Sequence, residues 1–189
     1  RLIISYHSIK YFLTYFFASF ILSATAQDYT VEILLDNAKN GCLLFRLPAQ
    51  SNKIEALRKA GRNEEGDDLK AKMEADQQAW VNAFKAKYTY GKVYFFFDYN
   101  ARAIAEGDLS SAFDFNFNLV EELEPKFLVA GPDQTETFSL NGIVILTPDM
   151  KEVPKKMPKF ISAWGFAHLS KKTYFQMAYE LSAVLNKYY

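Results

Sequence analysis

Residues 92–99, KVYFFFDY, decide the fold of this chain of 189 residues. From residue 93 to residue 97 every side chain is β-branched or aromatic, which predicts a strand. Because no polar residue interrupts this run, we expect both faces of the strand to be covered, as in the central strand of a layered sheet. The rest of the chain is therefore interpreted as strands that flank this one and helices that cover it.

Two shorter runs before this strand predict a hairpin. Residues 28–36, DYTVEILLD, suit a first short strand, and residues 42–47, CLLFRL, form an apolar run between Gly41 and Pro48 that indicates a buried strand. The residues between the two runs include asparagine and glycine, which favour a turn. We expect the two strands to pair across that turn.

Residues 51–88 predict a long helical segment. Its apolar residues recur at helical spacing on one face, at Ile54, Leu57, Leu69, Met73, Trp80 and Phe84. Asn52 followed by Glu55 resembles a capping box at the start of the segment. The polar stretch 61–68 contains two glycines, so the helix either breaks there into a hairpin or continues as a weakened, exposed stretch.

Short elements follow the strand at 92–99. Residues 101–107 predict a short helix that ends at Gly107. Residues 109–118, LSSAFDFNFN, alternate with period two and predict a half-exposed strand. Residues 126–130, KFLVA, predict another strand, and residues 131–133 predict a turn after it.

The clearest local signal is the dipeptide Asn141-Gly142. It stands between two strand-like runs, TETFSL and IVILT, and predicts a two-residue hairpin of type I′. Residues 160–166 predict one more strand. Ser170 is expected to cap a last helix with a one-sided apolar stripe formed by Tyr174, Ala178, Leu181, Leu185 and Tyr188.

These elements predict a single α/β (α+β) domain, in which a mixed β-sheet carries the long helical segment and the C-terminal helix. The alternative is an antiparallel meander sheet with flanking helices. The order of the elements resembles the βαβαββα order of the thioredoxin-like fold. The place where that family carries Cys-x-x-Cys here contains Leu47-Pro48-Ala49-Gln50. The resemblance therefore implies a fold and implies no redox activity.

The first 26 residues, RLIISYHSIKYFLTYFFASFILSATA, resemble a secretory signal peptide. Arg1 and Lys10 supply a basic start, residues 11–22 form a nearly unbroken apolar run, and residues 24–26 supply a cleavage site of small residues. A helix over residues 11–26 would be about 24 Å long at ~1.5 Å per residue. A bilayer core requires about 30 Å. We therefore favour a cleaved signal, with a retained N-terminal anchor as the alternative.

The expected organisation is a signal peptide at residues 1–26 and one α/β domain at residues 27–189, secreted or periplasmic, with no stable membrane span after cleavage. The chain has 22 basic and 22 acidic residues, and the leader contributes two of the basic ones. This near-neutral balance argues against a nucleic-acid partner, because such binders carry a basic patch. The single cysteine, Cys42, cannot form an internal disulfide, and its apolar neighbours predict a buried, unreactive thiol.

No pattern in the sequence specifies a catalytic, cofactor-binding or metal site. Asp98 and Asn100 are the best candidates for a catalytic role, because ligands of open α/β sheets bind beyond the carboxyl ends of strands. His168 is a candidate general base without a partner that spacing identifies. No cofactor and no metal ion are expected.

Three further charged patterns are interpreted as solvated surface. The series Asp114-x-Asn116-x-Asn118 resembles the start of a calcium loop but lacks the glycine and glutamate that the loop requires further on, so we interpret it as the polar face of a strand. The acidic residues 121–124 and the lysine-rich stretch 151–159 are interpreted as a solvated helix end and a solvated loop.

The sequence thus predicts an exported, non-catalytic binding domain of the cell envelope or extracellular space, with an unknown protein or small-molecule ligand. The alternatives are a carboxylate-dependent hydrolase that uses Asp98 and a structural partner subunit of an envelope complex.

Overall fold

The protein, as a computed structural model, is described here for residues 29–134, 141–164 and 170–189. Within these residues one mixed sheet has the strand order β2-β1-β3-β4-β5. Strand β1 pairs in parallel with both β2 and β3, whereas β4 is antiparallel to β3, and β5 is antiparallel to β4. The bounds are Cys42–Leu47 for β1, Lys92–Phe97 for β2, Phe127–Gln134 for β3, Asn141–Leu146 for β4 and Phe160–Ser162 for β5. The α/β class and the mixed sheet are confirmed.

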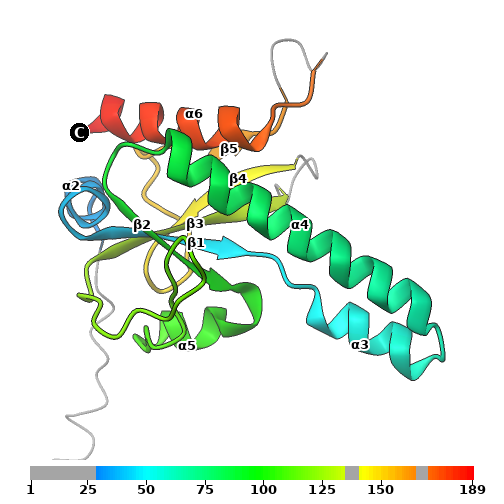
Figure 1. Cartoon of the computed structure of the whole chain (residues 1–189). Helices are drawn as coiled ribbons and strands as arrows, with labels where there is room; N and C mark the ends of the chain where they lie inside the picture. The colour runs from blue at the N-terminus through cyan, green and yellow to red at the C-terminus, as the bar shows by residue number, and fades with distance from the viewer. Residues whose placement is uncertain (1–28, 135–140, 165–169) are drawn as a thin grey trace, which may run out of the picture.

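Helices cover both faces of this sheet (Figure 1). The long helix α4 (Asn63–Lys87) and the C-terminal helix α6 (Tyr174–Tyr188) pack on one face, and the short helix α5 (Ala101–Ala105) lies on the other. Side chains of β1 alternate between the two cores: Leu43 and Phe45 join the first, and Cys42 and Leu44 join the second. This alternation is why the run 42–47 is apolar throughout.

The strand predicted at 92–99 exists as β2, but its predicted central position is wrong. β2 lies at the edge of the sheet, where only a bridge between Phe95 and Phe113 extends the pairing outward. Phe95 is buried on one face and Phe96 on the other, so the expectation of two covered faces is confirmed. An unbroken apolar run reports how a strand is covered, and it carries no information on how many strands flank it.

The predicted strand at 28–36, and the hairpin it would form with 42–47, are wrong. The segment forms helix α2 (Val31–Asp36) and continues as a π-helical turn, η1 (Asn37–Gly41). Thr30 caps the helix, because its side chain accepts a hydrogen bond from the backbone N–H of Ile33 at 3.3 Å. Leu34, Leu35 and Ala38 are buried in the same core. This spacing belongs to one face of a helix, because the two adjacent leucines of a strand would point to opposite faces.

The helical segment 51–88 is confirmed, and it breaks into α3 (Ser51–Lys59) and α4. Gly61 adopts a φ of +77° in the turn between them, whereas Gly66 lies inside α4. The predicted capping box of Asn52 and Glu55 is wrong: the N-cap is Gln50, in a left-handed conformation. Helix α3 and the first part of α4, residues 51–72, project from the sheet as an arm (Figure 1).

The segment 109–118 is not a strand. Asp114 closes a tight turn, because its Oδ1 accepts hydrogen bonds from the backbone N–H groups of Asn116 at 2.8 Å and Asn118 at 2.9 Å. Phe117 takes a positive φ of 62° in this turn. The ring of Phe117 stacks on Phe113 with the centroids 5.2 Å apart. The alternating phenylalanines do gather on one side, as a strand would place them. The polar residues between them, however, form a turn and not the exposed face of a strand. The short helix before this segment is confirmed as α5.

The turns predicted at 131–133 and at Asn141-Gly142 are also wrong. Strand β3 continues through residues 131–133, and Asn141 and Gly142 begin β4 opposite Gln134 and Asp133. Gly142 is needed there for packing, because a Cβ would lie 2.2 Å from the carbonyl oxygen of Ile161. The run TETFSL, residues 135–140, lies outside the described residues.

The last helix is confirmed as α6, but its cap is Thr173 and not Ser170. The Thr173 side chain accepts a hydrogen bond from the backbone N–H of Gln176, and the Gln176 side chain accepts one from the backbone N–H of Thr173, which forms a capping box. Ala178, Leu181 and Leu185 of the predicted stripe are buried, whereas Tyr188 is 45% exposed.

Candidate functional site

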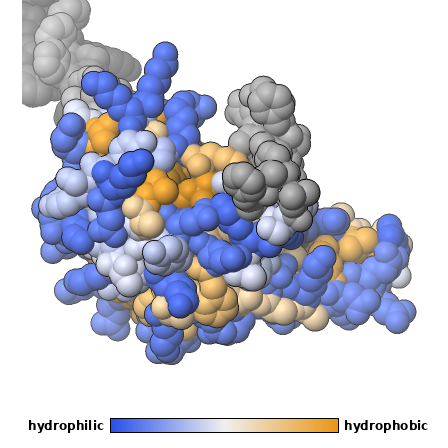
Figure 2. Space-filling view, turned by 90° about the horizontal axis from the view of Figure 1, so that it is seen from above, coloured by the Kyte–Doolittle hydropathy of each residue, from blue (hydrophilic) through white to orange (hydrophobic). Residues whose placement is uncertain are grey.

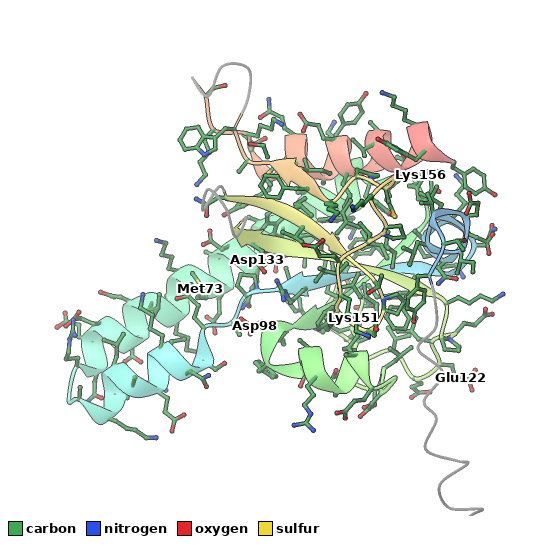
Figure 3. All side chains as sticks on the ribbon, turned by 180° about the vertical axis from the view of Figure 1, so that it is seen from behind. Met73, Asp98, Glu122, Asp133, Lys151 and Lys156 are labelled. Atoms are coloured by element: carbon green, nitrogen blue, oxygen red, sulfur yellow. The ribbon has the colours of Figure 1, made fainter. Side chains whose placement is uncertain are left out.

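The parallel strands β1, β2 and β3 end at the same edge of the sheet, beside the base of the arm. Ligands of open α/β sheets bind beyond this carboxyl edge. Two cavities lie there, and Met73 on α4 lines both of them. Figure 3 labels Met73 and Asp133, which come to this edge from α4 and β3.

The first cavity, here called the arm cavity, lies between the arm and the end of β2 and has a volume of about 400 Å³. Its floor is apolar and its rim carries charges of both signs. Tyr99 stands at its rim with 60% of its surface exposed and stacks on Phe97 with the ring centroids 5.5 Å apart. The lining of this cavity includes Ala49, Ser51, Ile54, Met73, Phe97 and Tyr99.

The second cavity, the helix cavity, lies between α4, α6 and the junction of β3 with β4, and has a volume of about 340 Å³. Trp80 and Tyr174 form an aromatic wall with their ring centroids 4.5 Å apart. The Tyr174 hydroxyl donates a hydrogen bond to Asp76 at 3.0 Å, which fixes this wall. Burial, together with Asp76, raises the pKa of Tyr174 to about 12.

A short stretch of chain, residues 48–51, separates the two cavities and is called the ridge below. Pro48 and Gln50 line the helix cavity, whereas Ala49 and Ser51 line the arm cavity. Successive side chains of the ridge therefore point to opposite sides. Gln77 holds the ridge on α4, because its Nε2 donates a hydrogen bond to the carbonyl oxygen of Pro48 at 2.8 Å.

The charges around the arm cavity balance. Arg58 and Lys70 supply two positive charges, and Glu55 and Glu74 supply two negative ones. Arg58 pairs with Asp67 at 2.7 Å, and Lys70 lies 3.7 Å from Glu74. These are exposed pairs, which stabilise a protein little and leave their members able to turn toward a ligand.

The predicted catalytic candidates do not meet in either cavity. Asp98 and Asn100 belong to a single 3-10 turn after β2, η2 (Asp98–Asn100), and only their neighbours Phe97 and Tyr99 line the arm cavity. Asp98 is close enough to contribute, after burial, to the raised pKa of Tyr99. His168 lies outside the described residues.

Cys42 is buried at the start of β1, as predicted. Burial raises the pKa of its thiol to about 12, and Lys92 opposes this effect weakly. The thiol is therefore protonated at neutral pH, and it lies at the amino ends of the parallel strands, away from the two cavities.

The series Asp114-x-Asn116-x-Asn118 forms a turn. The Asp114 carboxylate accepts hydrogen bonds from backbone N–H groups of that same turn. Hydrogen bonds from the backbone N–H groups of Asn118 and Asn116 lower the pKa of Asp114. Across the described ranges, no group of three or more potential ligands gathers in a way that could hold a metal ion.

Sequence reasoning missed the cavities, although it placed Met73 and Trp80 on the apolar face of the helical segment. One residue in the sequence, Gln77, could have indicated a contact here, because it falls on that same face four residues after Met73. A polar side chain on a buried face needs a partner, and here the partner is the ridge. Nothing in the sequence alone identifies the carbonyl group of Pro48 as that partner.

Comparison of the chain with models of protein families, with curated proteins and with solved structures gave no match. In the part of the chain that the structure describes, none of the helices combines the length and the apolar character that crossing a membrane requires. The geometry of the two cavities is therefore the observation from which a function can be inferred.

Proposed function

We propose that this protein is an exported, non-catalytic binding domain whose ligand occupies the arm cavity and the helix cavity. The observation that carries this proposal is the position of the two cavities. They adjoin each other at the carboxyl edge of the parallel strands and share Met73 as a common floor. Cavities of about 300–1,000 Å³ with apolar floors and a few polar groups are typical of ligand sites.

Binding is favoured over catalysis by the side chains around the cavities. Asp76, which lines the helix cavity, accepts the hydrogen bond of Tyr174, and Gln77 is engaged by the ridge. The carboxylate-dependent hydrolase would require Asp98 in a cavity with a second acid, and Asp98 lines neither of these two. The other side chains that line the two cavities can contact a ligand through apolar surface and through charges of both signs.

A capture experiment tests the binding role. The purified protein is incubated with an extract of envelope material from its source cell, repurified, and examined by native mass spectrometry for a bound species. Met73→Lys places a charge under both cavities and is expected to abolish capture. Ala71→Lys introduces the same residue on an exposed position of the same helix and is expected to preserve capture.

Met73 is only 6% exposed, so its replacement can also unfold the protein. Ser51→Phe avoids this risk, because Ser51 is exposed at the mouth of the arm cavity, and Asn52→Phe on the neighbouring exposed position is its control. If no species is captured, or if the same species binds all folded variants equally, the proposal is wrong. A captured protein that remains bound to all variants would instead favour the partner-subunit alternative.

The export proposal has its own test. Intact-mass measurement of the protein from its source cell should give an N-terminus at Gln27, since residues 24–26 supply the small-residue cleavage site. An uncleaved leader on protein recovered from the cytosol would contradict this proposal and would leave the binding proposal open to its separate test.

A further inference from the structure

The ridge between the cavities presents backbone groups that the protein itself does not use. Neither the N–H nor the C=O of Ala49 makes a hydrogen bond within the described parts of the chain, although Ala49 is half-buried. The adjacent Pro48 has its carbonyl engaged by Gln77. Ala49 therefore offers one donor and one acceptor at the boundary between the two cavities.

The shape and lining of the two cavities suit a ligand with two bulky apolar groups. Each is closed on its inner side by apolar side chains: Ile54 and Phe97 in the arm cavity, Trp80 and Met177 in the helix cavity. Met73 lies under both, and methionine adapts its shape to different partners more readily than other apolar residues. A ligand that fills both cavities must place one group on each side of the ridge and join them by a narrow linker.

Charge adds a third constraint. Around the helix cavity, Lys171 and Lys172 stand against Asp76 and Asp133, so this cavity, like the arm cavity, has no excess of either sign. A strongly charged ligand would meet no surplus of opposite charge in either cavity. A ligand of low net charge needs no such surplus in order to bind. Apolar surface visible on the arm among hydrophilic residues is consistent with such a ligand (Figure 2).

We infer that the two cavities form one site for an extended polypeptide segment of low net charge, with one large apolar side chain in each cavity and its backbone paired with Ala49. This inference rests on the proposed binding function. A peptide with uncharged side chains is the chemical class that meets these constraints: it has bulky side chains at regular spacing joined by a narrow backbone, alternating backbone donors and acceptors, and a low net charge. Main-chain hydrogen bonds supply affinity in such complexes, and side-chain pockets supply specificity.

Trp80 provides a built-in reporter, because it lines the helix cavity. The chain has two tryptophans. Trp164→Phe removes the other one, which lies at an exposed position, and leaves Trp80 as the sole source of indole fluorescence. Fluorescence of this variant, excited where tyrosine does not absorb, is titrated with synthetic capped peptides of five to seven residues.

The probes are acetyl-Gly-Phe-Gly-Phe-Gly-amide, its relatives with two or three glycines between the rings, and acetyl-Gly-Phe-Gly-Gly-Gly-amide with a single ring. The best two-ring peptide is expected to bind about tenfold or more tightly than the single-ring peptide, because it buries a second large apolar side chain. Methylation of the amide nitrogens between the two rings should weaken binding, because it removes the donors that face Ala49. Ser51→Phe should reduce the two-ring advantage, and Asn52→Phe should not.

Three results would overturn the inference: no peptide of the panel changes the Trp80 signal, the single-ring peptide binds as tightly as every two-ring peptide, or N-methylation has no effect. The capture experiment separates this failure from failure of the proposed function. A species that depends on the cavities but survives treatment of the extract with protease would keep the binding function and refute the peptide. Absence of any species that depends on the cavities would refute both.

Discussion

Gly91 lies directly against the backbone of Ala38: a Cβ built on Gly91 would be 2.3 Å from the carbonyl oxygen of Ala38. This contact joins the π-helical turn η1, which ends before β1, to the chain that enters β2. The close approach exists only because residue 91 has no side chain.

Replacement of Gly91 by alanine is expected to destabilise the protein by about 1–3 kcal/mol, because the backbone of η1 must move to admit the methyl group. Gly66→Ala is the matched control. There the new Cβ would lie 3.2 Å from the flexible Arg58 side chain and at an ordinary contact distance of 3.6 Å from the carbonyl oxygen of Ile54, and the helix interior gains up to ~1 kcal/mol. Urea unfolding of both variants measures the difference. Equal stabilities would contradict the close packing at Gly91.

Tyr88 is buried, and its hydroxyl has no hydrogen-bond partner among the described residues. Burial raises its pKa far above that of a free phenol, with smaller contributions from Tyr90 and Cys42. Removal of an unsatisfied buried group relieves its desolvation penalty, so Tyr88→Phe should raise the free energy of unfolding by about 1 kcal/mol.

The control for Tyr88 is Tyr90, whose hydroxyl donates a hydrogen bond to the carbonyl oxygen of Leu35 at 3.2 Å. Tyr90→Phe loses that bond and should lower the free energy of unfolding by roughly 1 kcal/mol. Denaturant titrations should therefore move the two variants in opposite directions. A loss of stability in Tyr88→Phe would mean that its hydroxyl has a partner in the folded protein.

Gln77 and Gln78 are adjacent on α4 and differ in what their amides do. Gln77 is buried and donates to the carbonyl of Pro48, whereas Gln78 is exposed and bonds to Asn82 at 3.1 Å. Gln77→Met should cost about 1–3 kcal/mol, because it leaves the Pro48 carbonyl without its partner. Gln78→Met should change stability by less than roughly 0.5 kcal/mol. Thermal unfolding compares them, and similar losses in both variants would show that the ridge does not depend on Gln77.

Tyr174 should make the protein sensitive to alkali. Its pKa is raised to about 12 in the folded protein, first by burial and then by Asp76, from an ordinary value of 10.0. The neutral phenol is thus favoured by folding, so its contribution is complete below pH 10 and is lost as the pH rises toward 12.

Stability measured against pH tests this contribution. The wild type should lose stability more steeply between pH 10 and pH 12 than Tyr174→Phe does, although the variant starts from a lower value because it lacks the hydrogen bond to Asp76. Parallel curves for the two proteins over this range would show that Tyr174 ionises equally in the folded and unfolded states.

Cys42 should resist alkylation while the protein is folded. Its side chain is buried, so a reagent cannot reach the sulfur. Its pKa is raised to about 12, so almost none of the reactive thiolate is present near pH 8. Iodoacetamide labelling followed by intact mass should show little modification in buffer and complete modification in urea. Rapid labelling of the folded protein would contradict the burial of this strand.

The periodic patterns in the sequence predicted the kind of element, strand or helix, more reliably than its place in the fold. The apolar runs at 42–47 and 92–97 became strands, and the helical stripes became α4 and α6. The failures occurred where one local pattern fits two structures. The mixed polar and apolar pattern of residues 28–36 suits a strand or a helix, and Asn141-Gly142 suits a turn or the start of a strand. At Gly142 the finished fold also requires glycine for packing, because a side chain there would meet the carbonyl oxygen of Ile161.

For this protein, the sequence by itself determined that the runs 42–47 and 92–97 are buried strands and that most of the apolar stripes of α4 and α6 face the core, because hydrophobic spacing along the chain records which face of a regular element is buried. Only the tertiary structure decided that β2 lies at an edge, that Met73 floors two cavities, and that Gln77 reaches the carbonyl of Pro48. These features depend on contacts between separate segments, such as Pro48 and Gln77, which are 29 residues apart. The spacing of residues within either segment carries no record of the other.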